Sequence, residues 1–171
     1  MKIVLMLFTI LFLCSCLPVN SFNVTDTGIT ANITYKAVIS SYQSAFCKRV
    51  VDGDTIEVEI EGQEYIVRYI GIDTPETVHP SQPVEYMGKE ASAKNKELVL
   101  NKKVQLEKDI TDKDKYGRLL RYVYVDDVMV NQELVRLGYA SVYTYPPDVK
   151  YVYKFMQAES EAKTGKRGLW K

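Results

Sequence analysis

Hydrophobic and polar residues alternate in short runs between residues 45 and 125, which is the pattern of strands that are buried on one face. Ile56, Val58 and Ile60, for example, are separated by glutamates. Gly62 follows this run and predicts the turn of a hairpin. The runs predict five strands, at residues 45–51, 55–60, 65–72, 103–110 and 118–125.

Apolar residues at helical spacing predict three helices, at residues 85–100, 131–137 and 149–164. We expect Asn131 to cap the second helix, and Gly138 and Gly165 to follow the ends of the second and third. The last helix has a set of residues at helical spacing: Val152, Phe155, Met156, Glu159 and Ala162. Trp170 should pack back onto the domain. The residues thus predict a small, β-rich α+β domain with the element order of an oligonucleotide-binding barrel.

The predicted hairpin also concentrates charged residues at its open end. Asp54 opens the outgoing strand and Asp73 ends the returning one, so a turn near Gly62 places the two carboxylates side by side. Two carboxylates and a nearby carbonyl oxygen form the kind of site that suits Ca²⁺. Arg68 lies on the returning strand, where its guanidinium group can hold a phosphate, and Glu76 follows as a candidate general base.

Each of these features also has a purely structural interpretation. Aspartate and glycine are common in turns, and a D-T-P-E corner can simply end a strand, because proline cannot continue a ladder. The convergence of all four charged residues on one end of a hairpin favours a functional site over four unrelated turn residues.

Further motifs, ordered and widely spaced, strengthen that interpretation. D-G-D-T is followed by R-x-x-x-I-D-T-P-E-T, by D-K-Y-G-R, by V-N-x-x-L-V-R-x-G-x-A and by a terminal Trp170. Together these residues resemble the staphylococcal nuclease family over positions 46–170. The resemblance implies a five-stranded oligonucleotide-binding barrel with about three helices, and a nuclease activity.

The same resemblance assigns roles to the charged residues. Arg68 and Arg118 would hold the scissile phosphate, and Glu76 would orient or deprotonate the attacking water. Asp52 would support the metal-binding loop. The implied ligands of one Ca²⁺ are Asp54, Asp73 and the backbone carbonyl of Thr74.

The resemblance also implies a nucleotide-binding surface formed by Lys115, Tyr116 and Tyr143. Aromatic faces stack on any base, which suits an enzyme with little sequence preference. The segment Y-T-Y-P-P around Tyr143 is one residue shorter than the family pattern, so Tyr145 is an alternative to Tyr143.

The implied function is that of a monomeric, Ca²⁺-dependent endonuclease that hydrolyses DNA and leaves 3′-phosphate ends, with RNA left open as a second substrate. One alternative is a binding module that has lost its catalytic residues; another is an envelope protein whose metal only stabilises a loop. Loss of Asp54, Arg68, Glu76 or Arg118 would have favoured the binding module, and all four are present.

The overall charge gives no sign of a nucleic-acid partner, since 22 basic residues balance 22 acidic ones. The distribution is uneven, however. Acidic residues are in excess between residues 48 and 64, and basic residues between 87 and 121. A neutral total can therefore include a positive groove beside an acidic metal site.

The first residues predict export. Lys2 precedes an apolar run at residues 3–13 that is too short for a comfortable membrane span, so residues 1–16 are interpreted as a signal peptide. The sequence L-C-S-C resembles a bacterial lipoprotein cleavage box with Cys16 as the lipidated residue; ordinary secretion is the alternative. Residues 17–44 are predicted to be a polar linker and residues 45–171 the nuclease domain, outside the cell or attached to the envelope.

Overall fold

The computed structural model describes residues 42–77 and 83–171. Five strands are long enough to build a barrel: β1 (Tyr42–Val50), β2 (Thr55–Ile60), β3 (Gln63–Tyr69), β5 (Lys103–Glu107) and β6 (Leu119–Val125). Three further strands have two residues each: β4 (Ile72–Asp73), β7 (Val128–Met129) and β8 (Ser141–Val142). The helices are α2 (Gly88–Val99), α3 (Val130–Arg136), α4 (Val152–Thr164) and the 3₁₀ turn η1 (Gly168–Trp170).

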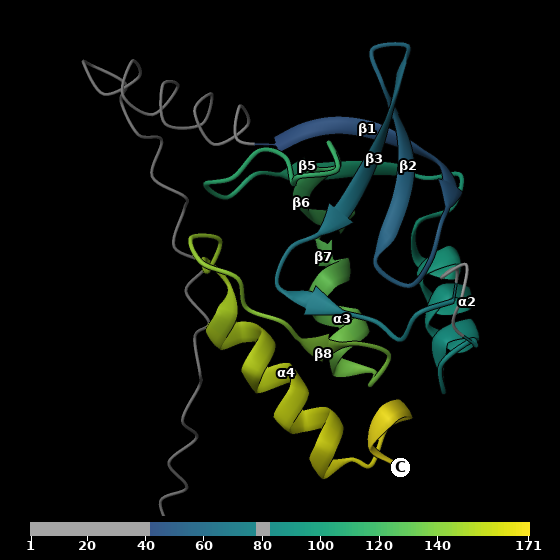
Figure 1. The fold of residues 1–171 in the computed structure, drawn as a ribbon, viewed down its shortest axis with the longest axis vertical. Helices are drawn as coiled ribbons and strands as arrows, with labels where there is room; N and C mark the ends of the chain where they lie inside the picture. The colour runs from purple at the N-terminus through teal and green to yellow at the C-terminus, as the bar shows by residue number, and fades with distance from the viewer. Residues whose placement is uncertain (1–41, 78–82) are drawn as a thin grey trace, which may run out of the picture.

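The five long strands form a closed barrel of mixed direction (Figure 1). Antiparallel pairing gives the order β3-β2-β1-β5-β6, and a parallel pairing of β3 with β6 closes the ring. At this seam Val67 faces Leu119 and Arg68 faces Leu120. The predicted β-rich α+β class and the five-stranded barrel are thus confirmed.

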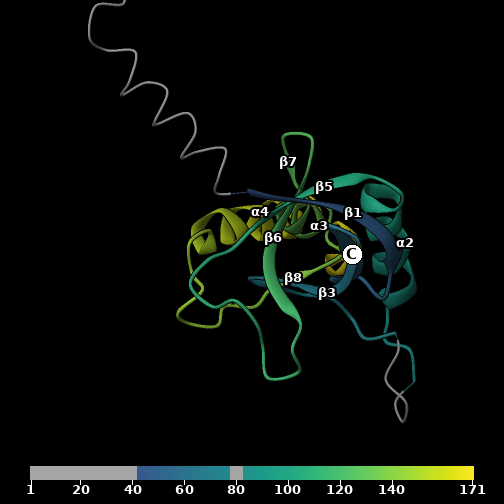
Figure 2. The same ribbon diagram turned by 90° about the horizontal axis from the view of Figure 1, so that it is seen from above.

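The helices lie beneath the barrel and on two of its sides. α3 lies beneath it, and α2 and α4 lie on opposite sides in both ribbon views (Figures 1 and 2). The core fills the barrel and continues between it and α3 and α4. Fully buried side chains include Val58, Val67, Val104 and Val123 from the strands and Ala91, Leu134 and Phe155 from the helices.

The strand predicted at residues 65–72 is broken after Tyr69. Gly71 adopts a positive φ of 81°, which favours glycine, and the Phe155 ring packs so closely that a Cβ on Gly71 would lie 2.4 Å from it. The chain turns there, and Ile72 pairs with Val142 of β8 instead of continuing β3. This bend redirects the segment that carries the predicted metal ligands.

The predicted helix cap at Asn131 is wrong. Asn131 lies inside α3, whose N-cap is Met129, and the Asn131 side chain is fully buried. Its amide donates to Ile70 O (2.9 Å) and accepts from Val123 N (2.9 Å). A buried amide that bridges two barrel segments through backbone groups has its own polar atoms satisfied.

Met156, one of the residues at helical spacing, is 55% exposed, while Phe155 and Ala158 form the buried side of α4. The C-terminus packs back as predicted. Leu169 N donates to Gly138 O (2.8 Å), and the Lys163 ammonium lies 4.4 Å from the centre of the Trp170 ring.

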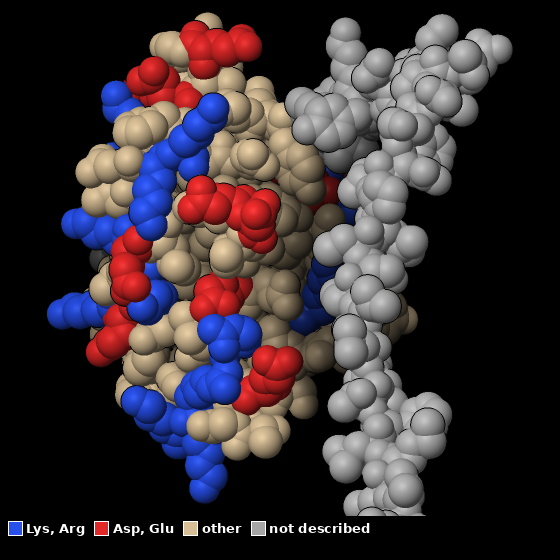
Figure 3. Space-filling view, turned by 180° about the vertical axis from the view of Figure 1, so that it is seen from behind, with Lys and Arg blue, Asp and Glu red and all other residues tan. Residues whose placement is uncertain are grey.

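β1 begins at Tyr42, three residues before the predicted start of the domain. The predicted signal peptide, Cys16 and most of the predicted linker lie outside the described residues. Within the described part of the chain, no helix combines the length and apolar character needed to cross a membrane. Figure 3, which views the molecule from behind, shows basic and acidic side chains interspersed over the visible described residues.

Candidate active site

Asp54 is at the centre of the site and is only 4% exposed. Its Oδ2 accepts hydrogen bonds from Thr74 N (2.8 Å) and Thr74 Oγ1 (3.0 Å), and its Oδ1 accepts one from Thr55 Oγ1 (3.1 Å). Gly53 permits this contact, because a Cβ there would lie 2.6 Å from Thr74 Oγ1. The D-G-D turn therefore packs directly against the D-T-P-E corner.

Arg68 joins the two predicted metal-binding carboxylates. Its Nη2 lies 3.1 Å from Asp54 Oδ2 and 2.7 Å from Asp73 Oδ1. Its Nη1 donates to the carbonyl oxygens of Tyr69 and Ile72, both at 3.0 Å. The predicted proximity of Asp54 and Asp73 is confirmed, and a guanidinium group lies between them.

Asp52 supports this turn from behind. Its Oδ1 accepts from Asp54 N (3.0 Å), and its carbonyl oxygen accepts from the buried Asn95 amide of α2 (3.0 Å). Tyr69 fixes that amide by donating to Asn95 Oδ1 (2.9 Å). Burial, together with the neighbouring charge of Asp54, raises the pKa of Asp52 to about 6.

Glu76 follows the corner and is held through its backbone. Glu76 N donates to Glu85 Oε2, and Glu85 N donates to Glu76 O, both at 3.0 Å. Gly88, the first residue of α2, packs against the same segment, since a Cβ there would lie 3.0 Å from Glu76 O. The Glu76 carboxylate accepts from Thr77 N (2.9 Å).

Arg118 belongs to a tight turn organised by Asp114. Asp114 Oδ1 accepts from Tyr116 N (2.9 Å) and Arg118 N (3.0 Å), and Oδ2 accepts from Arg118 Nε (2.6 Å). Burial raises the pKa of Asp114, but these hydrogen bonds outweigh it and hold the pKa below its usual value. Gly117, at φ 83°, allows the chain to turn, and the Arg118 guanidinium lies 5.4 Å from the centre of the Tyr116 ring.

These elements enclose a small space of about 70 Å³, here called the acidic hollow. It is lined by Asp52, Asp54, Thr55, Arg68, Asp73, Thr74, Pro75, Glu76 and Arg118. Every residue predicted to bind metal or to act in catalysis is therefore brought together. Its four carboxyl groups exceed its two guanidinium groups. In residues 42–77 and 83–171 no three His, Cys, Asp or Glu side chains form a metal-binding group by themselves, so a cation would also need the Thr74 carbonyl or water.

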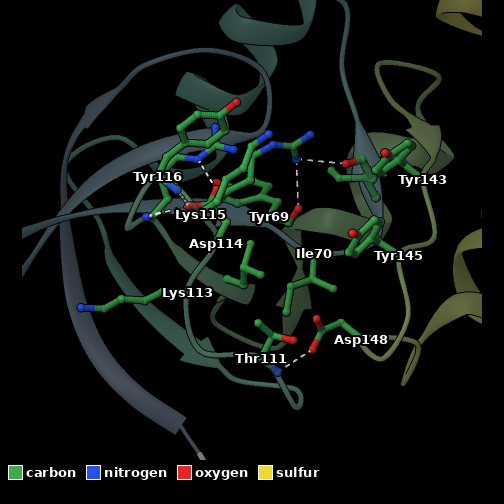
Figure 4. Close-up of a pocket in the computed structure, with 15 residues that line it drawn as sticks. Tyr69, Ile70, Thr111, Lys113, Asp114, Lys115, Tyr116, Tyr143, Tyr145 and Asp148 are labelled. Carbon is green, nitrogen blue, oxygen red and sulfur yellow. Dashed lines mark hydrogen bonds and ion pairs between the residues drawn. The ribbon is translucent and has the colours of Figure 1, made fainter.

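A larger cavity of about 510 Å³, here called the tyrosine cavity, adjoins the hollow (Figure 4). Arg68 and Arg118 line both. Tyr116, Tyr143 and Tyr145 line the tyrosine cavity and are 72%, 56% and 70% exposed. Tyr143 and Tyr145 lie together on one side and Tyr116 on the other, so the structure presents both alternatives that the sequence left open.

Lys115 lines the tyrosine cavity as well, with its ammonium 5.0 Å from the centre of the Tyr116 ring. The residues that support the site were missed by sequence reasoning. They are Glu85, Asn95, Asp114 and the pair formed by Asp112 and Arg121 (Nη2 to Oδ1, 2.8 Å).

Of these supporting residues, Asp114 could have been found from sequence. Asp114 precedes Gly117 by three residues, which is a recognisable turn pattern, because an aspartate side chain often accepts from the backbone N–H two residues later. The others act across long sequence distances and leave no local pattern.

Comparison with known proteins assigns the family. The model of the staphylococcal nuclease homologue family matches residues 66–171. The thermonuclease of Staphylococcus intermedius is 46% identical over 128 residues, which are 75% of this chain and 76% of that protein. The chain belongs to the staphylococcal nuclease family.

Two relatives from Bacillus subtilis (strain 168) are longer proteins. The SPbeta prophage-derived endonuclease YokF is 51% identical over 124 residues, which are 71% of this chain and 42% of that protein. Endonuclease YncB is 49% identical over 124 residues, which are 71% of this chain and 59% of that protein. This staphylococcal nuclease homologue therefore shares one region with them rather than their full length.

Proposed function

We propose that this protein is a Ca²⁺-dependent nuclease that hydrolyses phosphodiester bonds of DNA. Membership of the staphylococcal nuclease family, with relatives named thermonuclease and endonuclease, makes it a hydrolase that acts on nucleic acid. The observation that supports the finer proposal is the acidic hollow, where the predicted metal ligands, both arginines and Glu76 line one space.

The hollow suits a hard divalent cation. Four carboxyl groups line the hollow with only two guanidinium groups, so added positive charge would be stabilised there. All candidate donors are oxygens, which Ca²⁺ accepts in flexible geometry. Asp54, Asp73 and the Thr74 carbonyl are the residues that would hold it. When bound, the cation would draw charge from the phosphoryl oxygens.

The chain's own groups complete the reaction. Arg68 and Arg118 would hold the phosphate and stabilise the charge that develops on its oxygens. A phosphate could replace Asp73 beside Arg68, because Asp73 is exposed and lines the hollow. It could replace Asp114 beside Arg118, because that pair lines the adjoining tyrosine cavity. Glu76 would orient the attacking water or accept its proton.

The tyrosine cavity would hold the nucleotide beside the reacting phosphate. Tyr116 with Tyr143 or Tyr145 offers stacking surfaces, and Lys115 offers charge for a terminal phosphate. Stacking tolerates every base, which supports a broad range of cleavage sites. We extend the proposal to 3′-phosphate products on the basis of the family resemblance.

Digestion of single-stranded DNA, double-stranded DNA and RNA by the purified protein tests the proposal, with Ca²⁺, with Mg²⁺ and with chelator. We expect cleavage of DNA with Ca²⁺ and little with Mg²⁺ or chelator, and mass spectrometry of the products should show 3′-phosphate ends. The Arg118→Ala variant controls for contaminating nucleases. Full activity in chelator would refute the metal dependence.

We also propose export, with or without a lipid on Cys16, because the N-terminal residues have the pattern of a signal peptide. Fractionation of producing bacteria with mass spectrometry of the N-terminus tests this. A diacylglyceryl group on Cys16 is expected for an anchored form and an unmodified terminus in the medium for a secreted form. An intact Met1 in the cytoplasmic fraction would contradict both.

A further inference from the structure

The tyrosine cavity contains a charged group that the proposed hydrolysis does not use. Asp148 lines this cavity and is only 6% exposed. It belongs to the same segment as the stacking tyrosines, and its backbone N–H donates to Tyr145 O (3.1 Å). A buried carboxylate beside a nucleotide pocket therefore needs an explanation.

The two oxygens of the Asp148 carboxylate have different surroundings. Oδ1 accepts from the backbone N–H groups of Ile110 (3.0 Å) and Thr111 (2.8 Å). No residue of the described ranges 42–77 and 83–171 donates a hydrogen bond to Oδ2. Figure 4 shows the carboxylate beside Thr111, with one oxygen joined to Thr111 N and the other turned away from it, toward Ile70.

A carboxylate oxygen in such a position selects a hydrogen-bond donor and disfavours an acceptor. Bases differ in this respect. Cytosine and adenine carry an exocyclic amino group, whereas uracil and thymine have a carbonyl oxygen at the corresponding position. Acidic side chains accept from the cytosine amino group in known recognition patterns.

We propose that Asp148 reads the base held in the tyrosine cavity and favours cytosine and adenine, which carry an amino group where uracil, thymine and guanine carry a carbonyl oxygen. The inference rests on the proposed nuclease function, because the cavity adjoins the acidic hollow through Arg68 and Arg118. Stacking on the tyrosines binds every base, and Asp148 adds a preference among them.

Single-stranded tracts of deoxycytidine and deoxyuridine are matched substrates, because their bases differ only in the hydrogen-bonding groups of the edge that includes position 4. We expect the kcat/KM of the wild-type protein to be about tenfold higher for the deoxycytidine tract, the effect of one charge-assisted hydrogen bond. Asp148→Asn keeps an oxygen for Ile110 and Thr111 but places an amino donor in the cavity. This variant should reverse the preference.

Asp127→Asn is the control, since it removes the same charge from the exposed turn between β6 and β7 and should keep the wild-type ratio. If the wild-type protein has nearly equal kcat/KM for the deoxycytidine and deoxyuridine tracts, the inference is overturned, even if Asp148→Asn fails to fold. A folded Asp148→Asn protein with the wild-type ratio also overturns it; a purely structural Asp148 would lower the thermal midpoint without changing base preference. Hydrolysis of neither tract by the wild type would refute the proposed function and this inference with it.

Discussion

Two clusters of acidic and basic side chains lie on the same barrel, and they differ in how completely their charges are satisfied. In the Glu107 cluster, formed by Glu107, Tyr124, Lys150 and Tyr151, the donors converge on a single carboxylate. Oε1 is bound by Lys150 and Tyr151, and Oε2 by Tyr124 (2.6 Å) and Tyr151 (3.0 Å). In the acidic hollow, four carboxyl groups share two guanidinium groups.

The pKa values follow this difference. Burial raises the pKa of Glu107, but the hydrogen bonds from Lys150 and the two tyrosines outweigh it and hold the pKa below its usual value. The pKa of Asp52 is instead raised to about 6 by burial and by Asp54. Similar residue types thus form a cluster of satisfied hydrogen bonds where donors are in excess, and a hollow with unmatched carboxyl groups, the proposed cation site, where acceptors are in excess.

The comparison predicts, first, that removal of Arg118 from the hollow lowers activity but leaves stability nearly unchanged. We expect Arg118→Ala to lower kcat at least about a hundredfold, the scale of removing one transition-state donor. The thermal midpoint should stay nearly unchanged, because this side chain is partly exposed and, among the described residues, its ion pair is to Asp114. The measurements are steady-state kinetics and thermal unfolding.

Arg136→Ala is the matched control. Arg136 forms a similar, partly exposed ion pair with Glu133 on α3 and does not line the hollow. The substitution should change neither quantity. A sharp fall in the midpoint of Arg118→Ala with kcat preserved would show that Arg118 is structural.

The second prediction concerns the Glu107 cluster, where the opposite result is expected. Glu107→Ala leaves two tyrosine hydroxyls and Lys150 without their acceptor, and should lower the free energy of unfolding by about 2–4 kcal/mol. The kcat should remain within about twofold, because Glu107 does not line either cavity. Urea unfolding and steady-state kinetics measure the two effects. A large loss of kcat in a variant that is still folded would show that the Glu107 cluster also contributes to activity.

Third, Ca²⁺ should stabilise the protein through the hollow alone. A ligand at a hundred times its Kd raises the free energy of unfolding by about 2.7 kcal/mol. Asp73→Asn should abolish most of this rise, since Asp73 is exposed and its loss costs the fold little. Thermal unfolding with and without Ca²⁺ gives the shift, with Asp127→Asn as the control; equal shifts in both variants would place the cation elsewhere.

The smallest effect is the pH dependence of the Glu107 cluster. A carboxyl group whose folded pKa is depressed contributes stability that is present above its unfolded pKa, about 4.3, and is lost as pH falls through the folded value. The stability difference between wild type and Glu107→Gln should therefore be constant from about pH 5.5 to 7 and shrink below about pH 4. Urea unfolding of both proteins across this pH range measures the difference in the free energy of unfolding. A difference that grows as the pH falls would contradict a lowered pKa of Glu107.

The sequence predicts the barrel well because each strand carries its own alternation. The strand at residues 55–60 is found with the predicted bounds, and the hairpin correctly brings Asp54 to Asp73. The local pattern fails to predict the structure where contacts with residues distant in sequence determine the backbone conformation or the role of a side chain. The break at Gly71 depends on the Phe155 ring, and Asn131 serves Ile70 rather than its own helix.

The site follows the same division. Its charged residues stand in short motifs that can be recognised in the chain. The residues that hold those motifs in place, such as Asn95 behind Asp52 and Arg121 under the Asp114 turn, act through contacts that only the folded barrel creates. Asp148 has no motif at all, and its unequal oxygens become visible only in the cavity.

The parallel seam between β3 and β6 has a consequence for biosynthesis. Residues 67–69 and 119–121 meet there, and Arg68 and Arg118 reach the hollow from its two sides. A chain that has emerged from the ribosome only as far as α2 holds the acidic hairpin but lacks the second arginine. With the role proposed for Arg118, hydrolytic activity would therefore require closure of the seam, which is a non-local folding event.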